Sequence, residues 1–452
     1  MSIALVILAA GKGTRMNSDL PKVLHPIAGA PLLHHAMRTG AALEPERTIV
    51  VAGHQADQVQ AAALEFDHTA EVLMQTEQLG TGHAVDQARE ALKGFKGDVV
   101  VLFGDTPFLK PETLERMIAA RRHHDVVVLG FDIAQVQPRY GRLVMDGDRL
   151  AKIVEYKDAT EEERQIRFTN SGLMACDATL LFDLIANLSN NNASGEYYLT
   201  EVPELANARG AKVTAVKCDE AETLGVDSRK DLAGAEAIYQ KNARTALLED
   251  GVTLTAPDTV FLSFDTAIGR DATIEPNVVF GPGVTIESGA TIRAFSHLEG
   301  CHVSRGTMVG PYARLRPGAE LSEDVHIGNF VEIKNAQIGT GTKVNHLSYI
   351  GDATLGAGTN IGAGTITCNY DGVMKHHTHI GDNVFIGSNT MLVAPVSVGN
   401  EAMTGSGSVI TKNVPDTALA LSRAEQTNKP GVALKLFEML KKKKQKLISG
   451  AK

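Results

Sequence analysis

Aliphatic residues recur every six positions through the C-terminal half of the chain. The series comprises Ile268, Ile274, Phe280, Ile286, Ile292, Leu298, Val309, Leu315, Leu321, Ile327, Ile333, Ile380, Ile386, Leu392 and Val398. No helix has this period, and an ordinary Gly-rich β-sandwich would show two-residue alternation at irregular spacing. A fixed hexad is typical of a left-handed parallel β-helix of hexapeptide repeats, in which each hexad forms one face of a triangular coil.

The N-terminal half has a different pattern, in which short apolar runs alternate with helix-like segments. The runs lie at residues 5–9, 48–51, 99–103 and 126–129. Strands that are apolar throughout are covered on both faces, so the pattern predicts an α/β, Rossmann-like domain with a mostly parallel sheet. Ligands of such sheets bind at the carboxyl ends of the strands.

The two patterns divide the chain near residue 230. We expect an α/β domain over residues 1–229 and a β-helix domain with a C-terminal tail over residues 251–452. The intervening residues 230–250 are rich in helix formers, which favours a rigid helical linker.

Composition indicates a cytoplasmic, multi-domain protein. The net charge of −9 disfavours nucleic-acid binding as the main role, and the basic run at residues 441–444 is typical of a solvated helix end. The apolar run at residues 3–10 is too short to span a bilayer. Four widely spaced cysteines favour free thiols in a reducing compartment. We expect neither a nucleic-acid nor a membrane partner.

The first candidate for chemistry is a Gly-rich turn after the first apolar run. It reads Leu-Ala-Ala-Gly-Lys-Gly-Thr-Arg-Met over residues 8–16, with Pro21-Lys22 beyond. Backbone amides in such a turn approach phosphate oxygens closely, and the basic side chains neutralise them. The turn lacks the Gly-Lys-Ser/Thr of a Walker A loop, and Met16 occupies the third glycine position of the dinucleotide fingerprint.

Residues 8–16 together with Leu-Pro-Lys-Val-Leu at 20–24 resemble the signature of sugar-1-phosphate nucleotidyltransferases. Further motifs are Gln-Leu-Gly-Thr-Gly-His-Ala at 78–84, Asn-Asn-Asn-Ala-Ser-Gly-Glu-Tyr-Tyr at 190–198 and Cys-Asn-Tyr-Asp-Gly at 368–372. Joined to a hexapeptide β-helix, the chain resembles the bacterial bifunctional N-acetylglucosamine-1-phosphate uridylyltransferase/glucosamine-1-phosphate N-acetyltransferase family over nearly its whole length.

The resemblance implies that the N-terminal half joins UTP to N-acetylglucosamine 1-phosphate and releases pyrophosphate. The sugar phosphate attacks the α-phosphorus in line, so the protein must position two anions and offset the charge that develops on pyrophosphate. Mg²⁺ prefers a few hard oxygen ligands together with phosphates and water. The family pattern places its ligands at Asp105, which ends the apolar run, and at Asp227, where relatives commonly have Asn. The additional negative charge of Asp227 bears on nucleotide affinity.

The same resemblance implies the substrate contacts of the N-terminal half. Arg15 and Lys22 are the catalytic cations that face phosphates. Contacts to UDP-N-acetylglucosamine fall at Leu8, Ala9, Ala10, Gly11, Lys22, Gln75, Gly80, Thr81, Phe103, Gly104, Asp105, Gly141, Glu155, Asn170 and Asp227. The sugar side comprises Gly141, Glu155, Asn170 and Asp227. Each has an ordinary structural explanation when taken alone, and only the joint match favours function.

For the β-helix the resemblance implies acetyl transfer from acetyl-CoA to glucosamine 1-phosphate. An amine that attacks a thioester must lose a proton, and His346 matches the catalytic base of the family. The glucosamine 1-phosphate contacts are Arg316, Lys334, Tyr349 and Asn360. The acetyl-CoA contacts are Ala363, Asn369, Tyr370, Ser388, Ser406 and Arg423. Residues 368–378 interrupt the hexads, and we interpret them as a flap over this site.

The resemblance also implies a homotrimer with parallel coils and acetyl sites between them. Two other functions remain open. One is a single-activity nucleotidyltransferase whose β-helix only oligomerises or regulates. A purely structural coil would need none of the predicted acetyl-transfer residues, which include His346, Asn369, Tyr370 and Arg423. The other is a non-catalytic subunit, which would be expected to lose Asp105, Lys22 or the glycine turn.

Overall fold

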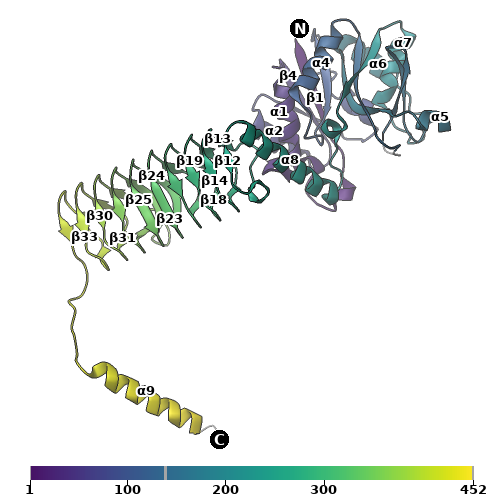
Figure 1. Ribbon diagram of the computed structural model, residues 1–452. Coiled ribbons are helices and arrows are strands. Elements are labelled where there is room, and N and C mark those ends of the chain that lie inside the picture. Colours follow the sequence, from purple (N-terminus) through teal and green to yellow (C-terminus); the bar gives the residue numbers. More distant parts are fainter. Residues whose placement is uncertain (1, 137–139, 450–452) are drawn as a thin grey trace. The chain divides into compact units, whose positions relative to one another are not determined.

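The computed structural model describes residues 2–136 and 140–449, which form two compact units (Figure 1). The first unit extends through Asp250 and includes Pro257–Thr266 and Phe280–Gly283. The second comprises Gly251–Ala256, Ala267–Val279 and the chain from Val284 onwards. The predicted boundaries near residues 230 and 250 stay a prediction.

A nine-stranded sheet forms the centre of the first unit. Seven strands follow the order β11-β7-β10-β6-β1-β4-β5, and β8 and β9 are attached beside β10. Their bounds are β1 (Ile3–Ala9), β4 (Arg47–Ala52), β5 (Glu71–Met74), β6 (Asp98–Phe103), β7 (Val126–Asp132), β8 (Arg142–Asp146), β9 (Arg149–Val154), β10 (Phe168–Asp177) and β11 (Val213–Cys218). A separate two-stranded sheet joins β2 (Pro26–Ile27) to β3 (Ala30–Pro31).

Helices cover both faces of this sheet. All of β1 is buried, and its alternate residues enter two different hydrophobic clusters because successive side chains of a strand point to opposite faces. One cluster includes side chains from α3 (Thr81–Asp86), α6 (Ala178–Ile185) and α7 (Val202–Ala208). The other includes side chains from α1 (Leu32–Ala41), α2 (Ala56–Phe66) and α4 (Pro111–Arg121). A short helix, α5 (Glu161–Arg164), buries no side chain. The predicted Rossmann-like architecture is confirmed.

The sheet is mixed rather than mostly parallel at its centre. β10 runs antiparallel to both of its neighbours, β6 and β7, and β8 and β9 also pair antiparallel. The apolar pattern did not reveal β10, because Thr169, Asn170 and Ser171 interrupt its run and the register shifts between Asn170 and Met174. This irregularity lies at one of the candidate sites described below.

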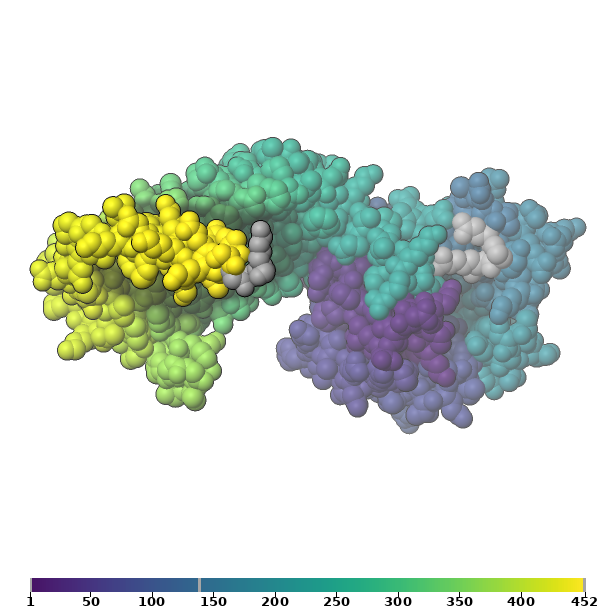
Figure 2. Space-filling model, turned by 90° about the horizontal axis from the view of Figure 1, so that it is seen from below, coloured from purple at the N-terminus to yellow at the C-terminus, as the bar shows by residue number. Residues whose placement is uncertain are grey.

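The predicted linker region is a single helix, α8 (Arg229–Glu249), within the first unit. It begins at Ser228, whose hydroxyl accepts a hydrogen bond from the backbone amide of Asp231 (3.2 Å). The buried amide of Gln240 exchanges two hydrogen bonds with the backbone of Leu262, at 2.7 and 2.8 Å. Figure 2 shows the teal segment that contains α8 against the purple N-terminal residues. Residues 257–266 therefore belong structurally to the first unit.

The second unit is a parallel β-helix, as predicted, with strands that follow one another along its axis (Figure 1). One face is a ten-stranded sheet of β12 (Thr253–Leu254), β14 (Thr273–Ile274), β17 (Thr291–Ile292), β20 (Met308–Val309), β23 (His326–Asn329), β25 (Lys343–His346), β27 (Asn360–Ile361), β30 (Phe385–Ile386), β33 (Met403–Thr404) and β35 (Leu419–Ala420).

The other two faces are joined where β24 (Glu332–Ile338) and β26 (Tyr349–Leu355) each pair with strands on both. One of them contains β13 (Ala267–Ile268), β16 (Thr285–Ile286), β19 (Cys301–Val303), β22 (Ala319–Leu321), β29 (Thr378–Ile380) and β32 (Val396–Val398). The last face contains β15 (Val279–Phe280), β18 (His297–Leu298), β21 (Arg314–Leu315), β28 (Ile366–Cys368), β31 (Met391–Val393) and β34 (Val409–Ile410).

The hexad residues fill the interior of the coil. All of those in the predicted series are buried except Ile268, which is half-buried. Buried threonines connect successive coils: the hydroxyl of Thr342 donates to the carbonyl of Gly356 (2.7 Å) and accepts from the amide of Thr359 (3.0 Å). Such hydroxyls satisfy backbone groups inside the coil.

Two segments depart from the coil. Residues 369–377 form a loop between β28 and β29, as the interrupted hexads predicted. After β35, residues 421–431 contain neither helix nor strand and lead to α9 (Val432–Ser449). Within the described ranges, no helix combines the length and the apolar character that crossing a bilayer requires.

Candidate functional site

A cleft opens in the first unit beyond the carboxyl ends of β1 and β6, as expected for this type of sheet. The residues that line it are Leu8, Ala9, Ala10, Gly11, Lys22, Val23, Gln75, Gln78, Gly80, Thr81, Ala84, Phe103, Asp105 and Glu196. The residues that we expected on the nucleotide side lie in this lining, except Gly104. Gly104 does not line the cleft; its amide donates to the carbonyl of Leu8 (3.0 Å), so it holds β6 against β1.

Four charged side chains from distant parts of the chain meet at one side of this cleft. The ammonium of Lys22 donates to carboxylate oxygens of both Asp105 and Asp227, the latter at 2.8 Å. Arg15 forms an ion pair with the second oxygen of Asp227 (3.0 Å) and is largely exposed. Burial by itself would lower the pKa of Lys22, but attraction to Asp105 and Asp227 outweighs burial and raises it above the ordinary value.

The two carboxylates are arranged to hold a cation. Asp105 and Asp227 converge on one ammonium group, which shows that a single positive centre can contact both. The described residues contain no cluster of three or more potential metal-binding His, Cys, Asp or Glu side chains. A pair of carboxylates nevertheless suits Mg²⁺, which completes its coordination with substrate phosphates and water.

The turn between β1 and Lys22 depends on a glycine at position 13. Gly13 has a φ of +59°, and an added Cβ would lie 2.6 Å from the Cβ of Lys22. Glycine alone adopts this conformation without strain and allows so close an approach. Gly13 therefore brings the backbone of the turn against Lys22, which explains its place in the motif.

A second cleft adjoins the first, and Thr81 and Phe103 line both. Its other lining residues are Tyr140, Gly141, Ile153, Glu155, Asn170, Ser171, Gly172, Met174, Leu199 and Thr200. Three of the four residues predicted on the sugar side are here, whereas Asp227 lies with Lys22. The backbone amide of Asn170 donates to the carbonyl of Gly141 (2.9 Å), so β10 and the chain before β8 position each other.

Glu155 is the ionisable group of this second cleft. Burial raises the pKa of its carboxyl, although a hydrogen bond from the hydroxyl of Thr200 (3.3 Å) partly opposes that effect. A carboxyl whose pKa is raised holds its proton to higher pH and can then donate a hydrogen bond to a hydroxyl oxygen of a ligand.

Sequence reasoning assigned no role to two polar residues of the first cleft. The side chain of Gln78 donates to the carbonyl of Ala10 (2.6 Å) and so fixes the Gly-rich turn, and Glu196 lines the opposite wall. Both residues lie inside motifs recognised in the sequence, at 78–84 and 190–198. The sequence therefore indicated that these segments belong to the site, but not which groups the two side chains contact.

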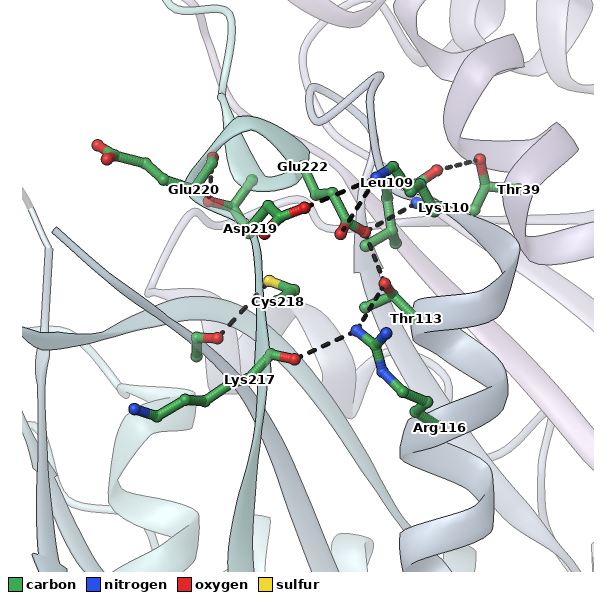
Figure 3. Close-up of polar contacts among 12 residues, drawn as sticks. Thr39, Leu109, Lys110, Thr113, Arg116, Lys217, Cys218, Asp219, Glu220 and Glu222 are labelled. Atoms are coloured by element: carbon green, nitrogen blue, oxygen red, sulfur yellow. Dashed lines mark hydrogen bonds and ion pairs between the residues drawn. The ribbon is translucent and has the colours of Figure 1, made fainter.

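A third polar cleft lies beside the sheet between α4 and the end of β11 (Figure 3). Its central group is the buried carboxylate of Glu222, which accepts hydrogen bonds from the hydroxyl of Thr113 (2.6 Å) and the backbone amide of Lys110 (3.3 Å). Lys110 pairs with Asp219 (3.7 Å), and Lys217 pairs with Asp132 (2.9 Å). These charges balance internally, which favours a structural role.

In the β-helix, His346 ends β25 and contacts the residue one coil earlier. Its Nδ1 lies 2.9 Å from the amide oxygen of Asn329, the residue it faces in the β23–β25 pairing. An amide oxygen only accepts, so Nδ1 carries the proton and Nε2 has the free electron pair. The ring is exposed, and Nε2 can therefore accept a proton from a bound molecule.

Four predicted residues form a column along one edge of successive coils, namely His346, Ala363, Ser388 and Ser406. The backbone amide of Gly364 bonds to the carbonyl of His346, and the amide of Asn389 bonds to the carbonyl of Ala363. Ser388 and Ser406 occupy the next two coils. Arg423, beyond the last strand, donates to the carbonyl of Ser406 (2.7 Å). This contact involves the backbone carbonyl of Ser406 and not its side chain.

Cations gather on the neighbouring face. Arg316 pairs with Glu332 (2.8 Å), and the backbone register places Arg316 one coil before Lys334. The ammonium of Lys375, in the loop 369–377, lowers the pKa of Lys334, which is the behaviour of two adjacent cations. Lys375 was not assigned a role from the sequence. Such a group attracts a dianionic phosphate.

Side-chain amides connect this face to the loop. Asp352 accepts hydrogen bonds from the side chains of Asn335 (2.6 Å) and Asn369 (2.5 Å), and Asn369 lies 3.4 Å from the hydroxyl of Tyr349. Burial would raise the pKa of Asp352, but these hydrogen bonds lower it below the ordinary value. Tyr370 is exposed and donates to the carbonyl of Gly372 (2.5 Å).

Two groups of predicted residues stay apart within one chain. Asn360 lies on the ten-stranded face, where it pairs with Lys343 and Phe385. In the described residues, no hydrogen bond or ion pair joins Asn360 or His346 to the cations Arg316, Lys334 and Lys375. These two groups therefore make no direct polar contact with one another within the described ranges.

Comparisons with known proteins cover both halves of the chain. Residues 5–171 match the family model of the MobA-like NTP transferase domain. Residues 265–300 and 377–412 match the bacterial transferase hexapeptide model, which describes six repeats.

Full-length relatives are similar over nearly the whole chain. The protein named Bifunctional protein GlmU from Ruegeria sp. (strain TM1040) is 69% identical over 444 residues, which covers 98% of this chain and 99% of the relative. The protein of the same name from Ruegeria pomeroyi is 72% identical, with 98% of both chains covered. That of Roseobacter denitrificans is 67% identical over 451 residues, 100% of both.

Proposed function

The chain belongs to the family of bifunctional GlmU proteins, and from this membership we propose how its two sites make UDP-N-acetylglucosamine. The β-helix acetylates glucosamine 1-phosphate with acetyl-CoA. The N-terminal unit then transfers UMP from UTP to N-acetylglucosamine 1-phosphate and releases pyrophosphate. The observation that carries this proposal is the pair of independent sites: two adjoining clefts beside Asp105, and an exposed His346 with a defined free nitrogen.

In the uridylyl transfer, the first cleft holds the nucleotide and the second holds the sugar. The shared residues Thr81 and Phe103 place the α-phosphate at the junction. An oxygen of the sugar phosphate attacks the α-phosphorus while the bond to pyrophosphate breaks. In the structure Lys22 and Arg15 pair with the carboxylates of Asp105 and Asp227. When another cation pairs with these carboxylates, Lys22 and Arg15 neutralise the phosphates instead. Glu155 and Asn170 bind sugar hydroxyls.

Asp105 and Asp227 are the residues that would hold Mg²⁺. When bound there, Mg²⁺ supplies charge neutralisation for the departing pyrophosphate. The ammonium of Lys22, which these two carboxylates hold in this structure, would then be free to bind the phosphates.

In the acetyl transfer, His346 acts as the general base. Nε2 removes a proton from the amine of glucosamine 1-phosphate, and the amine attacks the thioester carbonyl carbon, after which the bond to the CoA sulfur breaks. Asn329 holds the imidazole in the tautomer that leaves Nε2 free. Arg316, Lys334 and Lys375 bind the phosphate. Tyr349 and Asn360 bind the sugar. Ala363, Asn369, Tyr370, Ser388, Ser406 and Arg423 bind acetyl-CoA.

We expect the two units to catalyse their reactions independently, because their site residues do not interleave along the chain. A fragment of residues 1–283 should retain uridylyl transfer, and a fragment that begins at Gly251 should retain acetyl transfer. The first fragment extends to 283 because Leu262 bonds to Gln240 and Ser263 bonds to the carbonyl of Ala28 (2.9 Å). The assays are pyrophosphate release from UTP and acetyl transfer to glucosamine 1-phosphate.

Circular dichroism would establish that each fragment is folded. Loss of uridylyl transfer in a folded fragment of residues 1–283 would contradict independence, since the β-helix would then contribute to the first site.

The β-helix is expected to assemble as a trimer of parallel coils. Asn360 and the cations Arg316 and Lys334 lie on different faces of one coil, so packing of neighbouring coils would bring them around one ligand. Sedimentation should give a trimer at concentrations at which acetyl transfer is measured. A stable monomer that retains full acetyltransferase activity would refute this assembly.

A nucleotidyltransferase with a purely structural β-helix is not favoured. Such a coil has no need of a histidine oriented by Asn329 or of a cation group beside a buried carboxylate. We place the enzyme in the cytoplasm, because acetyl-CoA and UTP are intracellular co-substrates and its four cysteines are free thiols.

A further inference from the structure

The C-terminal helix α9 buries none of its side chains. Its apolar residues are among the most exposed of the protein, with exposed fractions of 68% for Leu434, 65% for Phe437 and 68% for Leu447. A helix with so many exposed apolar side chains is unusual in water. Their exposure costs free energy unless a partner covers them.

The helix has two distinct sides. Val432, Leu436, Leu440 and Leu447 recur at spacings of four, four and seven residues, which places them on one side of an α-helix, with Phe437 and Ile448 beside them. Lys435, Glu438, Lys442 and Lys446 line a shallow groove on another side. The apolar side and the basic side together make α9 an amphipathic helix.

The charge of α9 is opposite to that of the rest of the chain. Its eighteen residues contain six lysines and one glutamate, a net charge of +5, so the remaining residues carry −14 of the total of −9. Lysines are concentrated at 441–444, where they reach all sides of the helix. Lys443 and Lys444 thus lie on the apolar side itself, and their long aliphatic stems allow the ammonium groups to reach polar surroundings.

We propose that α9 binds the surface of a membrane that contains anionic phospholipids. The helix would lie parallel to the surface, with its apolar side among the upper acyl chains and its lysines at the phosphate headgroups. The combination of exposed leucines and phenylalanine with a basic polar side is the pattern of helices that bind at such interfaces. The sequence predicts no membrane partner and predicts a solvated helix end at the lysine run. The proposed peripheral contact departs from both expectations.

The aromatic column on the β-helix of a second copy fits α9 less well than an anionic surface does. It consists of Phe295, Tyr312 and Phe330, whose rings stack at centroid distances of 5.0 and 5.3 Å. The strands that follow this column carry Arg314 and Arg316, which share the single carboxylate Glu332, and then Lys334. These cations would repel a helix of net charge +5.

The segment before the helix permits such a contact. Residues 421–431 contain neither helix nor strand, and all of them are exposed. Eleven residues of extended chain span at most roughly 36–40 Å. The helix can therefore reach a surface without a fixed orientation of the coil.

Vesicle co-sedimentation of the full-length protein tests the proposal. Vesicles of phosphatidylcholine with phosphatidylglycerol should bind the protein at least about tenfold more tightly than phosphatidylcholine alone, because each lysine near an anionic surface adds to affinity. Added salt should weaken the binding, since it screens the lysines. Equal binding to both vesicle types, or no binding to either, would overturn the proposal.

A pair of variants identifies the helix as the contact. The double variant Phe437→Ser/Leu440→Ser should lose vesicle binding, whereas the control Gln445→Ser, on the polar side, should bind like the parent. Unchanged binding by the double variant would refute the role of α9. Sedimentation without lipid provides a further check: a smaller assembly in the double variant would show that another copy covers the helix. Both enzyme activities, measured without vesicles, should stay unchanged in these variants.

Discussion

Replacing Asp105 by alanine should abolish uridylyl transfer and leave acetyl transfer near the rate of the parent. The substitution removes one of the two carboxylates that converge on a single cation. Loss of a catalytic metal contact removes several kcal/mol of transition-state stabilisation, which corresponds to a decrease of about 10²-fold or more. Aminolysis of a thioester does not need the metal, so the second activity serves as an internal control. Pyrophosphate release and acetyl transfer would be measured on the same preparation.

Asp227→Asn is the matched comparison for this variant. It keeps an oxygen ligand and restores the residue common in the family, so its effect on uridylyl transfer should be mild. Melting temperatures would establish that both variants are folded. Equal loss of the two activities in a folded Asp105→Ala protein would mean that the carboxylate has a general structural role instead.

Replacing His346 by alanine should have the converse result. Acetyl transfer is expected to fall by ~10²–10⁴-fold, the usual contribution of a positioned general base, while uridylyl transfer is retained. The exposed ring makes a single contact through Nδ1, with Asn329, so its removal should cost little stability. Initial rates of both reactions and the melting temperature would be compared with those of the parent.

His297→Ala is a control for the loss of an imidazole from the coil surface. His297 is exposed on β18 and has no role in either site, so both activities should persist. If a stable His346→Ala protein acetylated within a few-fold of the parent, His346 would have no part in the mechanism.

The β-helix could be predicted in detail because its period translates directly into structure. Each aliphatic hexad residue points inward, and the single half-buried member, Ile268, belongs to the first strand of its face. The Rossmann-like domain was predictable from strands that are apolar on both faces. β10 was not, because a strand interrupted by Thr169, Asn170 and Ser171 resembles a loop in sequence.

The candidate sites show a similar division. The carboxyl ends of β1 and β6 predicted where the first cleft opens, but the contact between Lys22 and Asp227 joins residues 205 positions apart, and no local pattern encodes it. The contact between His346 and Asn329 spans 17 residues, about one turn of the coil. Counting three hexads per turn would have brought these two residues together from the sequence alone.

The central claim is that one chain carries two chemically independent active sites. The most direct test measures both reactions with the purified full-length protein and with the Asp105→Ala and His346→Ala variants. The account predicts that the parent releases pyrophosphate from UTP with N-acetylglucosamine 1-phosphate and acetylates glucosamine 1-phosphate, and that each variant loses one activity only. A parent protein that releases pyrophosphate but transfers no acetyl group would contradict it.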